Sequence, residues 1–238
     1  MKAIILAAGI GNRLKPIIDK TPKSLIRIGG RTILERMLDS LAAAGVRDIC
    51  LVTGYLKEMI AEAVGEEHNG AKIRYIENRE YKLGSIVSLW VARREFSTAD
   101  DLLLMDADVV FESRLIGRLI GSKNENCFLI DRHFSESGEE MKVAVLGWRV
   151  TQIARRITRK HDEVGEGVGF FKTSAAHRRE FLKAVEETIA LDRGADYEEA
   201  LDNFIRHVPA GIEEITGLKW TEVDFPEDIK KAESLKIR

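Results

Sequence analysis

The chain has 238 residues, of which 45% are hydrophobic and 32% charged, and its formal net charge is -2. This length and composition suit one large domain with a substantial core. The balanced charge argues against a general nucleic-acid-binding protein, and no apolar run approaches the roughly 20 residues of a membrane span. We therefore expect a cytoplasmic protein without a membrane span whose partners are small molecules.

Strand-like and helix-like runs alternate over the first half of the chain. Thr32 and Glu35 predict a capping box at the start of one helix, and Gly45 ends it. Strands joined by helices require crossover connections, so this half predicts a doubly wound, mostly parallel sheet with its ligand site at the carboxyl ends of the strands. The predicted strands are residues 2–6, 48–53, 72–77 and 101–105, and the predicted helices are residues 32–44, 56–64, 85–96 and 113–121.

The second half predicts an antiparallel or mixed extension of this sheet, because its strand-like runs follow one another with short turns. The predicted strands are residues 126–131, 142–146, 149–154, 167–172 and 220–224, and the predicted helices are residues 174–190, 197–207 and one from Pro226. We expect one α/β domain over residues 1–238, with a nucleotide-binding half at 1–125 and an acceptor-binding half at 126–238.

The first predicted strand runs into a turn of small residues, Ala7-Ala8-Gly9-Ile10-Gly11-Asn12-Arg13, and Pro22-Lys23-Ser24-Leu25 follows nine residues later. Small residues let backbone N–H groups approach a polyphosphate, and glycines at 9 and 11 permit a positive φ. Residues 1–34 carry seven Lys or Arg against one Asp. The segment is typical of a phosphate cradle, so we expect a nucleotide.

Three other interpretations of this turn remain open. A dinucleotide-binding fingerprint requires a glycine where Leu14 stands, and a P-loop requires Gly before the Lys-Ser pair, where this chain has Pro22. The simplest alternative is a tight strand-to-helix turn with solvated basic residues.

Two further predicted strands end in carboxylates. Asp106 and Asp108 follow the strand at 101–105, and their spacing of two residues points both side chains to the same side. Asp224 ends the strand at 220–224. Carboxylates at strand ends predict a divalent cation that bridges phosphate oxygens. A turn or helix cap at Asp106 and Asp108, and an N-cap at Asp224, are the alternatives.

Together these motifs resemble the nucleotidyltransferases that make nucleoside-diphosphate sugars and alcohols, and the resemblance spans most of the chain. Further segments are most similar to the phosphocholine and inositol-phosphate cytidylyltransferases. They are Thr53-Gly54-Tyr55-Leu56-Lys57-Glu58, Ser88-Leu89-Trp90, Glu140-Met141-Lys142-Val143 and residues 220–228. Gly84 stands where phosphocholine enzymes usually carry asparagines, which is more similar to the inositol-phosphate enzymes.

The resemblance implies a Rossmann-like, three-layer α/β/α fold with a mostly parallel, mixed central sheet, and it implies a role for each matching residue. Arg13 and Lys23 are the catalytic cations on the phosphates, and Asp108 and Asp224 bind Mg²⁺. The nucleotide contacts are Leu6, Ala7, Ala8, Gly9, Gly11, Gly54, Asn78, Ser85, Ser88 and Asp106. The acceptor contacts are Asp131, Lys142 and Glu166.

The implied reaction moves CMP from CTP to a small phosphorylated alcohol and releases pyrophosphate. A phosphate monoester is already anionic, so the reaction requires no general base. The same chemistry with UTP, dTTP or GTP and a sugar 1-phosphate is the alternative, and a nucleotide sensor or a dinucleotide-binding oxidoreductase represents other classes. The aromatic residues Trp90, Trp148, Phe170, Phe171 and Trp220 form either a cage for a quaternary ammonium or part of the core. We expect a monomer or homodimer.

Overall fold

The computed structural model describes residues 1–15, 20–97 and 100–237, and its centre is a sheet of ten strands. These strands are β1 Lys2–Ala7, β4 Asp48–Thr53, β5 Glu67–His68, β6 Ala71–Glu77, β7 Leu102–Asp106, β9 Cys127–Asp131, β10 Lys142–Leu146, β11 Arg149–Ala154, β12 Glu163–Thr173 and β13 Gly211–Glu214. Two small pairs lie outside the sheet, β2 Arg27–Ile28 with β3 Arg31–Thr32 and β8 Val109–Phe111 with β14 Trp220–Glu222.

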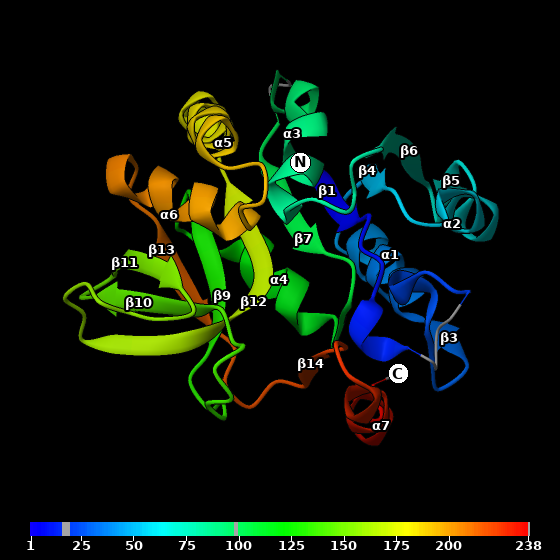
Figure 1. The fold of residues 1–238 in the computed structure, drawn as a ribbon. Helices are drawn as coiled ribbons and strands as arrows, with labels where there is room; N and C mark the ends of the chain where they lie inside the picture. The colour runs from blue at the N-terminus through cyan, green and yellow to red at the C-terminus, as the bar shows by residue number, and fades with distance from the viewer. Residues whose placement is uncertain (16–19, 98–99, 238) are drawn as a thin grey trace.

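Helices cover both faces of the sheet (Figure 1). They are α1 Ile33–Ala43, α2 Lys57–Val64, α3 Ser85–Val91, α4 Arg114–Gly121, α5 Arg178–Leu191, α6 Tyr197–His207 and α7 Pro226–Ser234. Residues of α1, α2 and α4 share one apolar core with one sheet face, and residues of α3, α5 and α6 share a second core with the other. The predicted three-layer α/β/α fold is therefore confirmed.

The sheet is mixed, as predicted. Its main path runs β11-β10-β12-β7-β1-β4-β6-β5, and β7, β1, β4 and β6 are parallel neighbours. The second half joins by antiparallel pairing, since the long β12 pairs with β10, β9 and β7. Both predicted halves thus build one sheet. Their division into nucleotide and acceptor functions stays a prediction.

Several predicted boundaries are wrong. The strand predicted at 167–172 begins at Glu163, where its first residues pair with β10. The strand predicted at 220–224 ends at Glu222 and pairs with β8 outside the main sheet, and β13 was missed. The helix predicted at 85–96 ends at Val91, and a 3-10 turn follows that brings Glu95 to the buried Lys2 ammonium, 2.7 Å away. Long-range strand pairing and the buried charge of Lys2 therefore determined these boundaries more than local propensity did.

A third, smaller apolar cluster joins the two ends of the chain. Leu14, Ile26 and Ile33 from the N-terminal segment pack with Val223 and with Ala232 of α7. In Figure 1 the red α7 lies beside the dark blue segment that follows β1. This cluster holds the segment that carries Lys23 against the one that carries Asp224.

The start of α3 is fixed by a backbone contact that only glycine permits. A Cβ at Gly84 would lie 2.1 Å from the Ala195 carbonyl oxygen, and the Gly84 N–H donates to the Arg193 carbonyl. We expect Gly84→Ala to lower the free energy of unfolding by about 1–3 kcal/mol, measured by chemical denaturation.

Gly117→Ala in α4 is the matched control. A Cβ there meets nothing within 4 Å, so the helix should gain about 0.5–1 kcal/mol. Equal effects at the two glycines would contradict this account of the α3 packing.

Candidate active site

The turn after β1 has the small-residue geometry that the sequence predicts, with one correction. Gly11 has φ 67°, whereas Gly9 does not adopt a positive φ. The Gly11 carbonyl accepts from the Leu14 N–H at 3.0 Å, and Leu14 is fully buried in the third cluster. The turn is therefore anchored at Leu14, and the backbone of Ala7 to Gly11 remains close to the carboxyl end of the sheet.

Lys23 joins the turn to both predicted metal ligands. Its Nζ donates to Asp108 Oδ2 at 2.7 Å and also to Asp224 Oδ1. The Lys23 side chain is only 12% exposed. Burial favours a lower pKa for Lys23, but the Asp108, Asp224 and Glu222 carboxylates outweigh it and raise this pKa. The lysine is therefore a fixed cation between two acidic strand ends.

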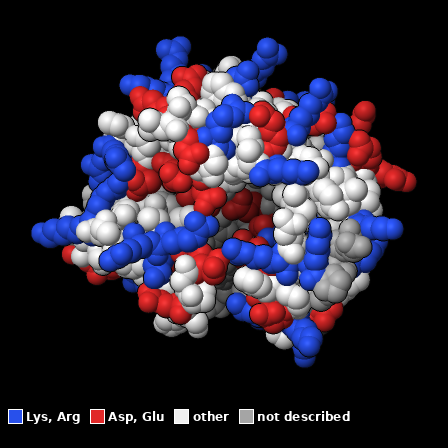
Figure 2. Space-filling model, viewed as in Figure 1, with Lys and Arg blue, Asp and Glu red and all other residues white. Residues whose placement is uncertain are grey.

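A third carboxylate completes this cluster. Oxygens of Asp108, Glu222 and Asp224 all lie within 4.8 Å of one another. The Glu222 side chain is exposed to water, but it lies within a cleft. The protein atoms around it and the nearby Asp108 and Asp224 carboxylates raise the pKa of Glu222 to about 8. Figure 2 shows this hollow near the centre of the face, with Asp and Glu in its depth and Lys and Arg at its edges.

Asp224 does not serve as the helix cap that the sequence left open. The Asp228 carboxylate accepts from the Asp224 N–H at 3.0 Å and from the Phe225 N–H at 2.8 Å, so Asp228 caps α7. This leaves the Asp224 side chain free to contact Lys23.

Arg13 lies at the rim of the cleft with half of its side chain exposed. It pairs with Glu139 at 2.9 Å, its guanidinium lies 3.8 Å from Asp224 Oδ2, and it stacks over the Phe225 ring. Arg13 and Lys23 therefore reach the same carboxylate from two sides.

Asp106 lies behind the cluster instead of within it. Its Oδ2 accepts from the Tyr197 hydroxyl at 2.6 Å and occupies the space that a Cβ at Gly169 would fill. Burial and the neighbouring Asp108 and Glu198 carboxylates raise the pKa of Asp106. Its described contact is thus structural, and the nucleotide contact implied by the resemblance stays a prediction.

The other predicted nucleotide contacts lie around the same edge of the sheet and hold one another. The Asn78 amide donates to Ser88 Oγ at 2.9 Å, and Ser85 Oγ accepts from the Tyr197 N–H. Gly54 lies against Ala8, since a Cβ there would be 3.0 Å from the Ala8 carbonyl oxygen. The nucleotide contacts of these residues stay predictions.

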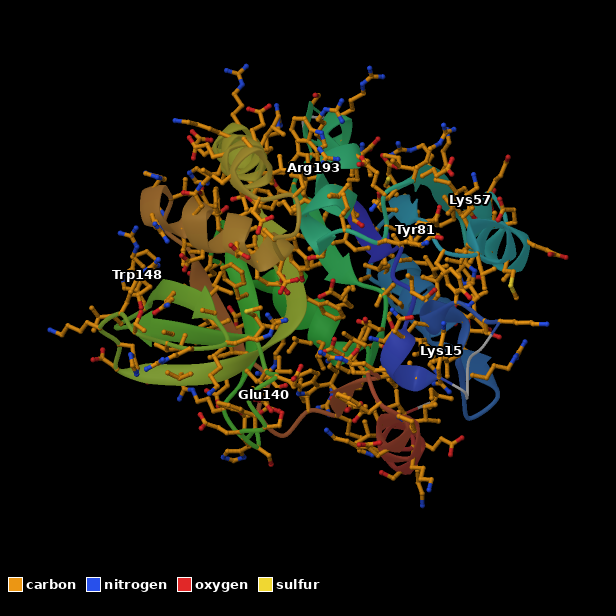
Figure 3. The ribbon with its side chains drawn as sticks, viewed as in Figure 1. Lys15, Lys57, Tyr81, Glu140, Trp148 and Arg193 are labelled. Carbon is orange, nitrogen blue, oxygen red and sulfur yellow. The ribbon has the colours of Figure 1, made fainter. Side chains whose placement is uncertain are left out.

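A groove of about 610 Å³ opens beside the carboxylate cluster. Its lining includes His133, Phe134, Glu139, Glu140, Glu166, Trp220, Glu222, Asp224, Phe225, Glu227, Asp228 and Lys231. We call this cavity the acidic groove. Figure 3 shows Glu140, one of its lining residues, on the loop between β9 and β10.

Of the three predicted acceptor residues, Glu166 lines the acidic groove, whereas Asp131 and Lys142 do not. Both oxygens of Asp131 accept internal hydrogen bonds, one from the His133 N–H and one from the Trp220 indole. Lys142 pairs with Glu136 at 2.7 Å. Lys142 also lies over the ring of Phe134, which lines the groove. Asp131 holds the Trp220 indole, and direct acceptor contacts by Asp131 and Lys142 stay predictions.

The proposed aromatic cage does not form as a unit. Phe170 and Phe171 are buried in the two cores, and Trp90 packs against one core and lies against Arg93. Trp148 is 64% exposed on the β10–β11 hairpin, away from the site (Figure 3). Of the five residues, Trp220 lines the acidic groove.

The family model for the MobA-like NTP transferase domain matches residues 3–170. The chain belongs to this family. The match includes the glycine turn, Lys23, Asp106 and Asp108, whereas Glu222 and Asp224 lie beyond it. The region matched to the MobA-like domain thus contributes Asp108 to the carboxylate cluster, and the C-terminal region contributes Glu222 and Asp224.

Relatives of this MobA-like protein act on different acceptors. It is 31% identical to the CMP-5'-(3-aminopropyl)phosphonate synthase of Streptomyces rubellomurinus, over 98% of this chain but 38% of that protein's length. It is 25% identical to the choline-phosphate cytidylyltransferase of Streptococcus pneumoniae, over 99% of this chain and 98% of that one. Its fold matches the inositol-1-phosphate CTP transferase from T. maritima with a TM-score of 0.79, at 20% identity and with 99% and 96% of the two chains covered.

Glu222, Tyr197 and Glu139 contribute to the site but were not predicted as site residues. Glu222 had a signal, because it precedes Asp224 by two residues on a predicted strand, and alternate strand residues share a side. Tyr197 and Glu139 had none, because tertiary packing alone brings Tyr197 to Asp106 and Glu139 to the acidic groove. Within the described residues, no helix is long and apolar enough to span a membrane.

Glu166 predicts a pH effect on stability. Burial, with Glu140 nearby, raises the pKa of Glu166 to about 7. Because this folded-state pKa lies above the unfolded value of 4.5, the folded protein loses stability as the pH rises from about 4.5 to about 7. We expect Glu166→Gln to be more stable than wild type at pH 8, by up to about 1 kcal/mol after screening by groove water, and similar near pH 5.

Thermal unfolding at both pH values measures this effect. Glu163→Gln is the control, since Glu163 lies on the same strand and forms a surface ion pair with Arg132. A pH-independent gain in Glu166→Gln, or the same gain in Glu163→Gln, would disprove the assignment.

Proposed function

We propose that this protein transfers CMP from CTP to a small phosphorylated or phosphonylated alcohol and releases pyrophosphate. The observation that carries the proposal is the Lys23 ammonium between Asp108 and Asp224, directly beside the glycine turn. One small cavity at this point is lined by Leu6, Ala7, Gly9, Lys23, Ser24, Ala107 and Asp108. The names of the relatives favour CTP as the nucleotide.

We propose Mg²⁺ as the cofactor, held by Asp108 and Asp224. The donor set suits a hard cation, because three carboxylates converge and Asp108 Oδ1 is buried without a partner among the described residues. When bound, Mg²⁺ supplies charge neutralisation between phosphate oxygens.

The protein's own groups supply alignment and electrostatic stabilisation. The acceptor's phosphate is mostly ionised at neutral pH and is itself the nucleophile, so the protein need not remove a proton. Arg13 and Lys23 neutralise the repulsion between two anions and stabilise the charge that builds on the leaving pyrophosphate. The glycine turn orients the triphosphate through its backbone N–H groups.

The acidic groove supports an acceptor with a cationic group at the end opposite its phosphate. Its charged lining is mostly Glu and Asp, and Phe134, Trp220 and Phe225 add aromatic surface. An ammonium is attracted by the charge of the carboxylates and by aromatic faces, whereas a neutral polyol gains only hydrogen bonds to the carboxylates. We therefore propose an amino alcohol phosphate or an aminoalkylphosphonate as the acceptor class.

Pyrophosphate release from a matrix of nucleotides and acceptors tests the function. With Mg²⁺, we expect CTP to exceed UTP, dTTP and GTP, and phosphocholine, phosphoethanolamine and an aminoalkylphosphonate to exceed inositol 1-phosphate and glucose 1-phosphate. Asp108→Asn should lose at least about 10²-fold in rate while it stays folded, as single electrostatic groups do elsewhere. Activity with a sugar 1-phosphate and another nucleotide would replace the cytidylyl proposal, and no turnover would leave a nucleotide sensor.

Lys23 and the cation compete for the same carboxylates, which gives a second test. In the absence of nucleotide, we expect Lys23→Met to bind Mn²⁺ about tenfold more tightly than wild type, by titration calorimetry, although it loses activity. The metal-free variant should unfold at a lower temperature, because three carboxylates then lack their cation.

Lys231→Met is the control for net charge, because Lys231 lines the same groove but makes no described contact with Asp108 or Asp224. Its Mn²⁺ affinity should change by less than about twofold, since an exposed charge is screened. Equal Mn²⁺ affinity of Lys23→Met and wild type would contradict the assignment of these carboxylates as the cation site.

A further inference from the structure

Ser24 is a buried polar residue for which neither the fold nor the proposed reaction has given a role. It lies in the short 3-10 turn Lys23–Leu25, whose backbone is closed by hydrogen bonds from the Leu25 N–H to the Pro22 carbonyl and from the Ile26 N–H to the Lys23 carbonyl. Ser24 is 4% exposed, and its Oγ has no partner among the described residues. An unsatisfied buried hydroxyl destabilises the folded protein unless a ligand satisfies it.

The cavity beside Ser24 indicates which part of the site such a ligand would occupy. Ser24 lines the same cavity as Leu6, Ala7 and Gly9 of the glycine turn and as Lys23 and Asp108. Asp108 Oδ1 is a second buried oxygen there without a described partner. Ser24 is not among the residues that line the acidic groove. The hydroxyl therefore faces the nucleotide side of the site.

The two unpartnered oxygens, Asp108 Oδ1 and Ser24 Oγ, suit different ligand atoms. A carboxylate oxygen repels a phosphate oxygen and requires a cation between them, whereas a serine hydroxyl donates directly to a phosphate oxygen. Lys23 is adjacent in sequence and lines the same cavity, so the positive charge that holds the phosphate lies next to the hydroxyl.

We propose that Ser24 is a further binding residue of this site and that its hydroxyl donates a hydrogen bond to a phosphate oxygen of the bound nucleoside triphosphate. This inference rests on the proposed function for the identity of the nucleotide. The Pro22–Leu25 turn then provides two groups to the triphosphate, the charge of Lys23 and the directed donor of Ser24.

The inference predicts opposite effects of one substitution on stability and binding. Ser24→Ala removes an unsatisfied hydroxyl, so the free protein should unfold at the same or a higher temperature. Its Kd for CTP with Mg²⁺, measured by calorimetry without acceptor, should rise about tenfold, as expected for a lost hydrogen bond to a charged group. A serine that acted only in the fold would lower stability instead.

Two further variants isolate the hydroxyl. Ser24→Cys keeps similar volume with a much weaker donor, so it should also bind CTP with Mg²⁺ more weakly than wild type. Ser40→Ala is the matched control, because Ser40 is also buried but its Oγ donates to the Arg36 carbonyl at 2.9 Å. Ser40→Ala should lower the unfolding temperature and leave the Kd unchanged.

The outcomes distinguish this inference from the proposed function. If wild type binds another nucleotide instead of CTP, the choice of CTP is wrong, and the same comparison is made with the nucleotide that binds. Unchanged binding in Ser24→Ala, or wild-type binding in Ser24→Cys, overturns the role of Ser24 alone. Mn²⁺ binding without nucleotide should be equal in Ser24→Ala and wild type, and a loss there would overturn the phosphate contact.

Discussion

The ion pairs of Lys23 with Asp108 and Asp224 are the interaction on which the cleft depends. Three residues from distant parts of the chain meet there, and Glu222 adds a further carboxylate within reach. Carboxylates this close repel one another unless a cation lies between them. Lys23 is that cation in the structure, and the same carboxylates are the ones proposed to hold Mg²⁺.

Main-chain pairing and apolar packing bring three backbone segments together at the carboxylate cluster. Leu6 of β1 pairs with Asp106 of β7, and the Ala107 N–H donates to the Leu6 carbonyl. The Val223 N–H donates to the Asp108 carbonyl at 3.1 Å, so the C-terminal segment is tied directly to the end of β7. Lys23 is fixed by the apolar cluster beneath α7. The geometry of the cluster is thus a consequence of main-chain pairing together with this apolar packing.

The two sides of the cleft differ in charge, with cations on one side and mainly carboxylates on the other. Arg13 and Lys23 stand at the glycine turn, whereas the groove beyond the carboxylate cluster is lined mainly by Glu and Asp. In the free protein, the cations of one side are paired with the carboxylates of the other. This division of charge is the basis on which we propose an anionic nucleotide for one side and an acceptor with a cationic end for the other.

The sequence by itself determined the class of fold, the glycine turn and the acidic strand ends, because these depend on local periodicity and on residue types with few alternative uses. Only the tertiary structure decided that Asp228 caps α7 while Asp224 faces Lys23, since a local motif fits either carboxylate equally well. It also decided that Asp131 holds Trp220, that Tyr197 holds Asp106, and that Glu139 and Ser24 line the cavities of the site. These roles depend on contacts between residues far apart in the chain, which periodicity and spacing do not encode.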